Sequence, residues 1–378
     1  MLKFPSLLRS ARMVTVSGLL LAVTSLPSFA QHFTRTDLTV NQSAVSPTAP
    51  NLDSNLKNAW GLTRSATSAW WIADNHAGVS TLYDSAGVPQ PTSPLIVTIP
   101  GVNGEQGTPT GTVFNYTTGF EVAPGAHAIF LFVTEDGTIA GWNPTVKPTD
   151  AVQVVPVPTT SGQPAHTEAV YKGCTLATTA QGTFLYVTNF GEGRVDVFDS
   201  AFHRVHLGQY AFRDPRVPKG FNPFNVQNVG GNLVVTFAKK ERGNDDETHG
   251  PGLGFVAIFD PQGRLLMDLQ HGSFLDAPWG VTQAPSDFGA FSHRLLIGNQ
   301  GDGTINAFNL VTGKFEGKLL DESGANLAID GLWALNFGSN GTSGSAIELF
   351  FTAGPDEEAD GLFGKIVPLS TEQRGSNE

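Results

Sequence analysis

Residues 185–199 read LYVTNFGEGRVDVFD, a strand, a polar turn and a second strand. Tyr, Val, Thr and Phe favour β-structure, and the Asn and Gly residues between the two strands are typical of a tight connection. The same pattern recurs along the chain, each time after a shorter strand. Six such units begin at residues 60, 110, 172, 224, 279 and 333, so that neighbouring units start 50 to 62 residues apart.

This repeat predicts the fold class. Strands of about five residues between Gly, Asn, Asp and Pro turns, with almost no helical periodicity, indicate an all-β protein. A unit of this length with four strands is typical of one propeller blade, and six units would close a ring. We therefore predict a six-bladed β-propeller with four antiparallel strands in each blade. Outer strands are expected at Leu95–Ile99, Val152–Val157, Arg264–Leu269 and Lys314–Leu320.

The sixth unit has only three strands before the chain turns polar over residues 369–378. Phe33–Val40 has an alternating pattern and no other assignment. We predict that this N-terminal strand supplies the outer strand of the last blade, because such pairing removes two open sheet edges and closes the ring. Residues 31–368 would then form a single β-propeller domain, followed by a polar C-terminal tail.

Residues 1–30 have the pattern of a signal peptide. Three basic residues are followed by an apolar run, Met13–Leu26, and Ser28–Ala30 supplies the small residues that signal peptidase requires. A membrane anchor is the alternative, but the run is shorter than the roughly 20 residues of a spanning helix. We expect cleavage after Ala30, a secreted or periplasmic protein and no membrane insertion after cleavage.

The chain is acidic. Its 22 Lys and Arg residues stand against 34 Asp and Glu residues, giving a net charge of −12, or −15 without residues 1–30. Nucleic acid binding needs clustered basic residues, so we expect no such partner. Cys174 is the single cysteine, and we expect it to be a buried thiol in a strand. Motifs of serine hydrolases, zinc proteases and phosphate-binding loops are absent, and we expect no nucleotide, haem or flavin.

Several segments resemble an uncharacterised family of exported bacterial proteins that is identified only by a family number. They are Thr134–Ile139, Gly252–Val256, Pro278–Gly280, Gly301–Phe308, Asp330–Leu335 and Phe351–Pro355. The resemblance covers about Asn55 to Ile366 and implies a six-bladed propeller similar in shape to NHL-repeat and gluconolactonase-like proteins. Many members end in a C-terminal sorting anchor, whereas this sequence ends in polar residues. The resemblance implies no established reaction.

Functional residues are expected at one rim of the propeller. When the first strand of each blade lines the channel, the loops between strands two and three meet the connections between blades on the same side. Candidate ligand-binding residues there are Asp74, Asn75, His76, Glu135, Asp136, His166, Asn189, His249, Asn299, Asp330 and Glu357.

Oxygen donors dominate this set, as Ca²⁺ or another divalent cation requires, and they would also suit a cationic ligand. For a metal, we select Glu135, Asn189, Asn299 and Asp74. The alternative is structural: Asp-Gly pairs are ordinary turns, and an Asn at matching positions in three blades can be one turn used three times.

Two further features each have two interpretations. Lys239–Gly250 is the most charged run, and it is either a solvated loop or a mobile lid over the rim. Trp60, Trp279, Trp333 and Phe224 begin inner strands in four units. They either pack between blades or form an aromatic wall that stacks on a sugar.

Three functions remain open from the sequence. The leading hypothesis is an exported, monomeric propeller that binds a small molecule, glycan or peptide at the acidic rim, with or without a divalent cation. The second is a metal-dependent hydrolase of the lactonase or phosphoesterase type. The third is a protein-interaction scaffold that uses the outer faces. Whether the protein is an enzyme is not decided by these residues.

Overall fold

The structure, a computed structural model, describes residues 32–155 and 169–370, which belong to one compact unit. The predicted signal peptide, His166 and the last two residues of one predicted outer strand, 156 and 157, lie outside the described residues. Within them, the helices are the short 3-10 turns η1 (Asn75–Ala77), η2 (Val102–Gly104) and η3 (Gly289–Phe291). None of these has the length or apolar character needed to cross a membrane.

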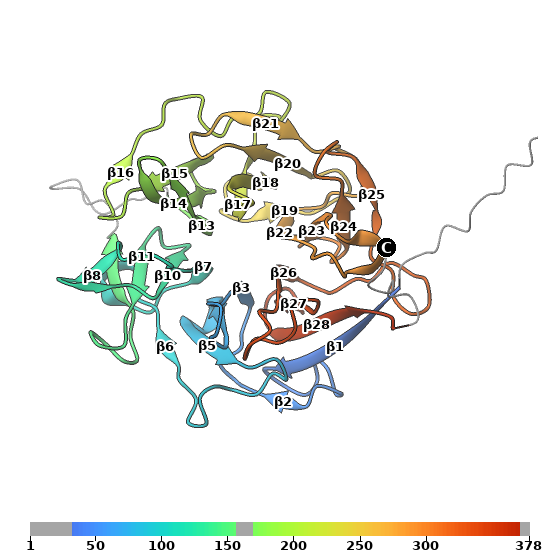
Figure 1. The fold of residues 1–378 in the computed structure, drawn as a ribbon, viewed down its shortest axis with the longest axis horizontal. Helices are drawn as coiled ribbons and strands as arrows, with labels where there is room; N and C mark the ends of the chain where they lie inside the picture. The colour runs from blue at the N-terminus through green and yellow to red at the C-terminus, as the bar shows by residue number, and fades with distance from the viewer. Residues whose placement is uncertain (1–31, 156–168, 371–378) are drawn as a thin grey trace, which may run out of the picture. The chain divides into compact units, whose positions relative to one another are not determined.

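Six sheets surround a common axis, which confirms the predicted six-bladed β-propeller (Figure 1). From the axis outward, the first three blades are β3 (Ala59–Thr63), β4 (Trp70–Asp74), β5 (Val79–Tyr83), β6 (Val97–Thr98); β7 (Pro109–Phe114), β10 (Phe130–Thr134), β11 (Ile139–Trp142), β12 (Val152–Val155); and β13 (Tyr171–Thr179), β14 (Gly182–Asn189), β15 (Arg194–Phe198), β16 (Arg204–Val205). The next two are β17 (Phe221–Val229), β18 (Asn232–Lys240), β20 (Gly254–Phe259), β21 (Leu265–Asp268); and β22 (Pro278–Gln283), β23 (Leu295–Asn299), β24 (Ile305–Phe308), β25 (Phe315–Lys318).

The predicted outer strands appear as β6, β12, β21 and β25. Three of them, β6, β21 and β25, are shorter than expected. The outer strand of the third blade, β16, was not predicted from the sequence. Two elements extend the blades. The strands β8 (Glu121–Ala123) and β9 (Ala126–His127) form a separate hairpin, and β19 (Glu247–Thr248) pairs with the end of β18.

The last blade contains β26 (Leu332–Phe337), β27 (Leu349–Ala353) and β28 (Leu362–Pro368), and it is completed by β1 (Phe33–Val40). The pairing of β1 with β28 is antiparallel and runs from Phe33 opposite Pro368 to Val40 opposite Leu362. The predicted closure by the N-terminal strand is therefore confirmed. One detail differs: β2 (Asn51–Leu52) adds a fifth strand parallel to β1, so β1 is not the outermost strand.

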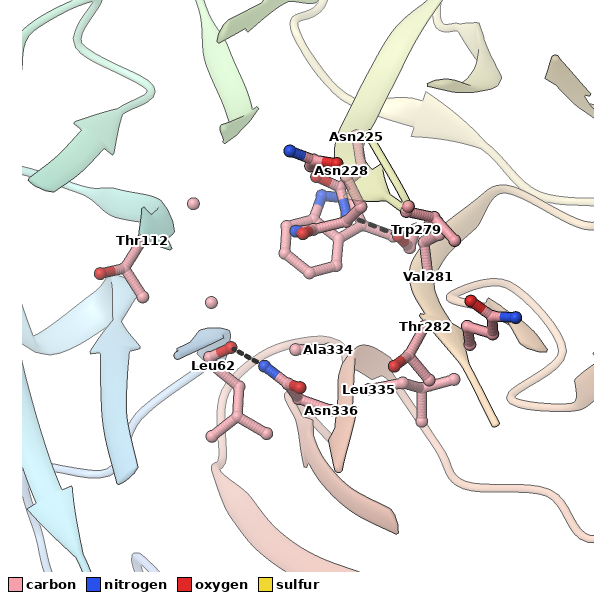
Figure 2. Close-up of a pocket in the computed structure, with 16 residues that line it drawn as sticks. Leu62, Thr112, Asn225, Asn228, Trp279, Val281, Thr282, Ala334, Leu335 and Asn336 are labelled. Carbon is pink, nitrogen blue, oxygen red and sulfur yellow. Dashed lines mark hydrogen bonds between the residues drawn. The ribbon is translucent and has the colours of Figure 1, made fainter. Parts of the chain in front are cut away.

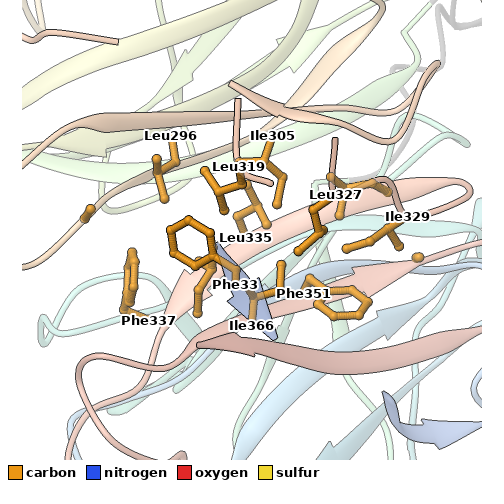
Figure 3. Packing of buried hydrophobic residues seen from close by; sticks show 14 of the residues in the cluster. Phe33, Leu296, Ile305, Leu319, Leu327, Ile329, Leu335, Phe337, Phe351 and Ile366 are labelled. Carbon is orange, nitrogen blue, oxygen red and sulfur yellow. The ribbon is translucent and has the colours of Figure 1, made fainter. Parts of the chain in front are cut away.

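Burial explains why β1 occupies this position. Phe33 is fully buried, and its ring centroid lies 5.0 Å from that of Phe288 in the fifth blade. Figure 3 shows Phe33 among aliphatic side chains such as Leu319 and Leu335, which come from the two neighbouring blades. The N-terminal strand thus carries a large apolar side chain into the boundary between the fifth and sixth blades.

The inner strands β3, β7, β13, β17, β22 and β26 contact one another in sequence, and β26 contacts β3, which closes the ring. Each inner strand pairs with the second strand of its own blade, and all twelve strands are described. In each pair the register shifts within the first few residues of the inner strand. Such β-bulges re-aim a side chain and strengthen the local twist. The residues at or beside the six irregularities are Trp60, Thr110, Lys172, Phe224, Trp279 and Trp333.

Candidate functional site

An acidic cavity lies at the rim where the sequence places the functional loops. Its volume is about 630 Å³, and five of the six blades contribute to its lining. We call it the acidic cavity, and its lining residues are His76, Glu135, Asp246, Glu247, His249, Gln300, Gly301, Asp330, Gly331, Gly354, Glu357 and Glu358. Five of the predicted site residues, His76, Glu135, His249, Asp330 and Glu357, are therefore brought together.

The third blade contributes a buried cation next to this cavity. Lys172 on β13 is 2% exposed, and its Nζ donates a hydrogen bond of 2.7 Å to Glu135 Oε1. The carboxylates of Asp246 and Glu247 each lie 4.0 Å from the same nitrogen. Burial opposes the charge, but Glu135 and Glu247 outweigh it and raise the pKa of Lys172 above its ordinary value. Lys172 is therefore a permanent positive charge.

Aromatic rings surround Lys172 on the channel axis. Its Nζ lies 4.8 Å from the ring centroid of Trp60 and 5.8 Å from that of Phe190, distances typical of cation–π contacts. The indole nitrogen of Trp279 donates to the Lys172 carbonyl oxygen over 3.1 Å. Side chains from three blades thus meet around Lys172.

We call Trp60, Phe190, Phe224, Trp279 and Trp333 the aromatic cluster. The centroid distances are 4.0 Å between Trp60 and Trp333, 5.8 Å between Trp279 and Trp333, and 6.0 Å between Phe224 and Trp333. Each of these side chains is at most 2% exposed. The prediction of packing between blades is confirmed for these residues, and the aromatic wall open to a sugar is wrong.

A chain of hydrogen bonds connects the aromatic cluster to the acidic cavity. The Trp333 indole donates to Asn58 Oδ1 over 2.8 Å, and Asn58 Nδ2 donates to Glu358 Oε2 over 2.7 Å. Asn75 Nδ2 donates to Glu135 Oε2 over 2.8 Å. Glu358 and Glu135 are therefore both oriented by buried amides, which fixes their carboxylates relative to Lys172.

Glu358 has the most perturbed carboxyl group of the cavity lining. Burial, followed by repulsion from Glu247 and Glu135, raises its pKa to about 7, although Lys172 and the Asn58 hydrogen bond oppose the rise. Its backbone is also unusual, because Asp356, Glu357 and Glu358 have φ angles of 57°, 52° and 69°. Three successive non-glycine residues in the left-handed region are strained, and such strain is concentrated at functional sites.

The charged segment Lys239–Gly250 is partly a hairpin. The strand β19 pairs with Lys239 and Lys240 of β18. Asp246, Glu247 and His249 of the same segment line the acidic cavity. The Nε2 atom of His249 lies 3.8 Å from Oε1 of the Glu247 carboxylate, and this interaction raises the pKa of His249. The interpretation as a wholly solvated loop is therefore wrong for Glu247, whose side chain is 4% exposed.

The other predicted site residues do not line the cavity. Asn75 lies beside it, as described above. Asp74 is fully buried and accepts a hydrogen bond of 2.7 Å from Thr81 Oγ1, and burial raises its pKa well above the ordinary value. Asp136 accepts hydrogen bonds from the backbone and hydroxyl of Thr108.

Asn189 and Asn299 order their own turns. Asn189 Nδ2 donates to Glu192 Oε2 and Asp196 Oδ2 over 2.5 and 2.9 Å, and Asn299 Nδ2 donates to Asp302 Oδ1 over 2.8 Å. Of the four residues selected as metal ligands, Glu135 alone lines the cavity. Among the described residues, no three His, Cys, Asp or Glu side chains are grouped as a metal ion would need.

The site residues selected from the sequence do not include Lys172, Glu247, Gln300 or Glu358, although the last three lie in loops that were predicted to reach this rim. Lys172 had a detectable signal, because it occupies the repeat position that is aromatic in four other units. The six inner strands are all within the described residues, and Lys172 is the one charged residue in them. A charged residue at an otherwise apolar repeat position indicates a buried ion pair or a site.

A second cavity of about 300 Å³ lies further along the inner strands (Figure 2). Its lining is neutral and includes Asn225, Asn228, Thr282 and Asn336, and Asn336 Nδ2 donates to the Leu62 carbonyl oxygen. Trp279 belongs both to this lining and to the aromatic cluster. The aromatic cluster therefore lies between a charged cavity and a neutral one.

Comparisons with known proteins give this chain relatives in sequence and a neighbour in fold. No family model matches it. A solved structure of a streptogramin B lyase is similar with a TM-score of 0.50 over 89% of this chain and 98% of that chain, but at 12% identity this shows the fold alone.

Two relatives in Acanthamoeba polyphaga mimivirus are closer in sequence. "Uncharacterized protein R648" is 32% identical over 84% of this chain and 76% of its own length, and "Uncharacterized protein L690" is 31% identical over 84% and 82%. Because both are viral, they give no support to the resemblance to a family of exported bacterial proteins. The chain belongs to the same protein family as these two uncharacterised mimivirus proteins.

Proposed function

We propose that this protein binds a small molecule or a peptide in the acidic cavity. The observation that carries the proposal is the convergence of loops from five blades on one cavity of about 630 Å³. Concave sites with a few oriented polar groups are the usual ligand sites of proteins, and propeller loops that meet on the axis are suited to form one. The carboxylates of Glu135 and Glu358 are held by buried amides, so the site is organised before a ligand arrives.

The energetic cost of the site supports a binding role over a scaffold role. A buried Lys172 with nearby carboxylates is expensive to desolvate, and apolar side chains of similar size would stabilise a ring equally well or better. Aromatic residues occupy the corresponding position in four other blades. A scaffold that uses the outer faces has no need for the charged group or for the strained turn at Glu357 and Glu358.

The proposal is tested by a ligand screen that monitors thermal unfolding. Wild-type protein is compared with Glu357→Lys, because Glu357 lines the cavity and is exposed. Amines, neutral saccharides, short peptides and Ca²⁺ form the four arms of the screen, so that a divalent cation is tested separately. A ligand that raises the Tm of the wild type should leave the Tm of Glu357→Lys unchanged.

The matched control is Glu121→Lys, which makes the same charge change at an exposed position on β8. It should keep the full ligand response. A ligand response that is equal in all three proteins would show that binding occurs elsewhere and would contradict the proposal.

We also propose export after removal of residues 1–30. The supporting observation is the basic, apolar and small-residue pattern of that segment. Expression of the full chain in a bacterium and mass measurement of the exported protein tests it. A mature protein that begins at Gln31 supports export, and an intact N-terminus in the cytosol contradicts it.

A further inference from the structure

We propose that the ligand of the acidic cavity is an organic ammonium ion, a protonated primary amine, which is held between Gln300 and the carboxylates of Glu357 and Glu358. This inference rests on the proposed function, since it names the chemical class that the same cavity would accept. It selects one class out of the small molecules, glycans, peptides and metal ions that the cavity size alone allows.

The charge balance favours a cation. Six carboxylate side chains line the cavity, and the neighbouring Lys172 interacts with Glu135, Glu247 and Asp246. Among the ion pairs of the described residues, none involves Asp330, Glu357 or Glu358. Asp330 and Glu357, together with the ionised fraction of Glu358, therefore leave excess negative charge on the sixth-blade side. This charge would repel an anionic ligand, and a cation would balance it.

An unpaired acceptor indicates a hydrogen-bond donor in the ligand. Gln300 lines the cavity and is 5% exposed, and its Oε1 has no hydrogen-bond partner among the described residues. A buried acceptor without a donor costs free energy. A primary ammonium carries three N–H donors and no acceptor, so it can satisfy an amide oxygen and two carboxylates at once.

The chain already holds one primary ammonium beside this cavity. Lys172 Nζ is bound by the Glu135 carboxylate and lies over the faces of Trp60 and Phe190. The alternatives have less support. No Trp, Tyr or Phe ring belongs to the lining on which a sugar could stack, and the described residues contain no group of three His, Cys, Asp or Glu side chains for a metal ion.

Binding of a cation should release a proton from Glu358. Glu247, Glu135, Lys172 and His249 all interact with this carboxyl group, and the two carboxylates favour its protonated form. A bound ammonium favours the ionised form instead, so the proton leaves as the ligand enters. His249 can also release a proton, and for this reason it needs its own control.

Isothermal titration calorimetry of the full-length folded protein near pH 7 tests the inference, with n-butylammonium as the probe. Tetramethylammonium is the comparison, because it has the same charge and no N–H donor. Two buffers of different ionisation enthalpy measure the protons released. We expect n-butylammonium to bind at least about tenfold more tightly than tetramethylammonium, as the loss of hydrogen bonds to charged groups predicts.

Variants locate the effect. Glu358→Gln should weaken n-butylammonium binding about tenfold and reduce proton release, and Gln300→Met should weaken binding with proton release unchanged. His249→Asn measures the histidine share of the released protons. Glu121→Gln is the control at an exposed site, and it should bind as the wild type does. Each variant is first checked for a wild-type circular dichroism spectrum and a cooperative unfolding transition.

The outcomes separate the two proposals. If n-butylammonium and tetramethylammonium bind equally, or if Glu358→Gln and Gln300→Met bind as the wild type does, the ammonium inference is wrong. If only Ca²⁺ or a saccharide gives a response that Glu357→Lys abolishes, the proposed function stands and this inference fails. If no compound gives a response that Glu357→Lys abolishes, both the proposed function and the ammonium inference are wrong.

Discussion

The Lys172 ammonium donates a 2.7 Å hydrogen bond to Glu135 Oε1 while only 2% of the Lys172 side chain is exposed. This contact joins the inner strand of the third blade to a loop of the second blade. A buried charge pair of this kind is costly to form, and it is still more costly to break, because one charge then remains without its partner. The pair therefore couples the stability of the ring to the charge of the acidic cavity.

Removal of the ammonium should destabilise the protein strongly. Lys172→Met keeps much of the side-chain volume but leaves Glu135 and Glu247 without their counter-charge. We expect a loss of about 3–5 kcal/mol in the free energy of unfolding, measured by denaturant titration. Glu135→Gln in the same chain should restore part of this loss. A loss below about 1 kcal/mol, within the range of surface ion pairs, would contradict a buried pair.

The stability of the protein should fall as the pH rises from about 5 to 8. The pKa of Glu358 is about 7 in the folded state and about 4.3 in an unfolded chain. Its stabilising contribution is therefore complete below the unfolded value and is lost as the pH rises through the folded value. The upper limit of this loss is roughly 4 kcal/mol, at 1.36 kcal/mol per pKa unit.

Glu358→Gln should flatten this pH dependence, which denaturant titrations at several pH values measure. The raised pKa of His249 acts in the same direction, because its stabilising contribution is also lost as the pH rises. His249→Asn therefore determines the histidine share. If the slope in Glu358→Gln equals that of the wild type, the carboxyl group does not titrate in this range.

Closure of the ring should depend on Phe33. Phe33→Ala removes a fully buried ring from between the fifth and sixth blades. We expect a loss of about 3–5 kcal/mol in unfolding free energy. Thr36→Ala, an exposed site on the same strand, should change it by less than about 0.5 kcal/mol. Equal effects of the two substitutions would show that β1 does not hold the last blade.

The single thiol should be unreactive in the folded protein. Cys174 is 1% exposed, and burial raises the pKa of its thiol, so the reactive thiolate is disfavoured. Labelling with a thiol reagent at pH 8 should proceed only as fast as the protein unfolds, and denaturant should make it immediate. Rapid labelling of one thiol per chain without denaturant would contradict the buried position.

The fold was predictable because blades repeat. Each blade is built from local strand and turn signals, and its neighbours bury the same apolar positions, so the spacing of the repeat predicts both the blade number and the need for β1 as a closing strand. The candidate site was predictable only in part. The prediction of a rim found His76, Glu135, His249, Asp330 and Glu357, because strand order alone decides on which side a loop emerges.

Other predicted site residues do not line the acidic cavity, and the reason is local. Asp136, Asn189 and Asn299 have the same residue types as a ligand site, but each accepts or donates within its own blade or turn. The sequence cannot distinguish these two uses of a polar side chain, because both need the same residue after a strand.

The sequence by itself determined the propeller, its six blades, its closing strand and the side of the ring on which polar loops gather, since all of these follow from periodic patterns. Only the tertiary structure decided which side chains meet on the axis. Closure of the ring places the Lys172 ammonium over the ring of Trp60, which comes from another blade, and brings Glu358 of the sixth blade near Glu247 of the fourth. Such contacts join residues more than a hundred positions apart, and no local pattern in a chain records a distance across a closed ring.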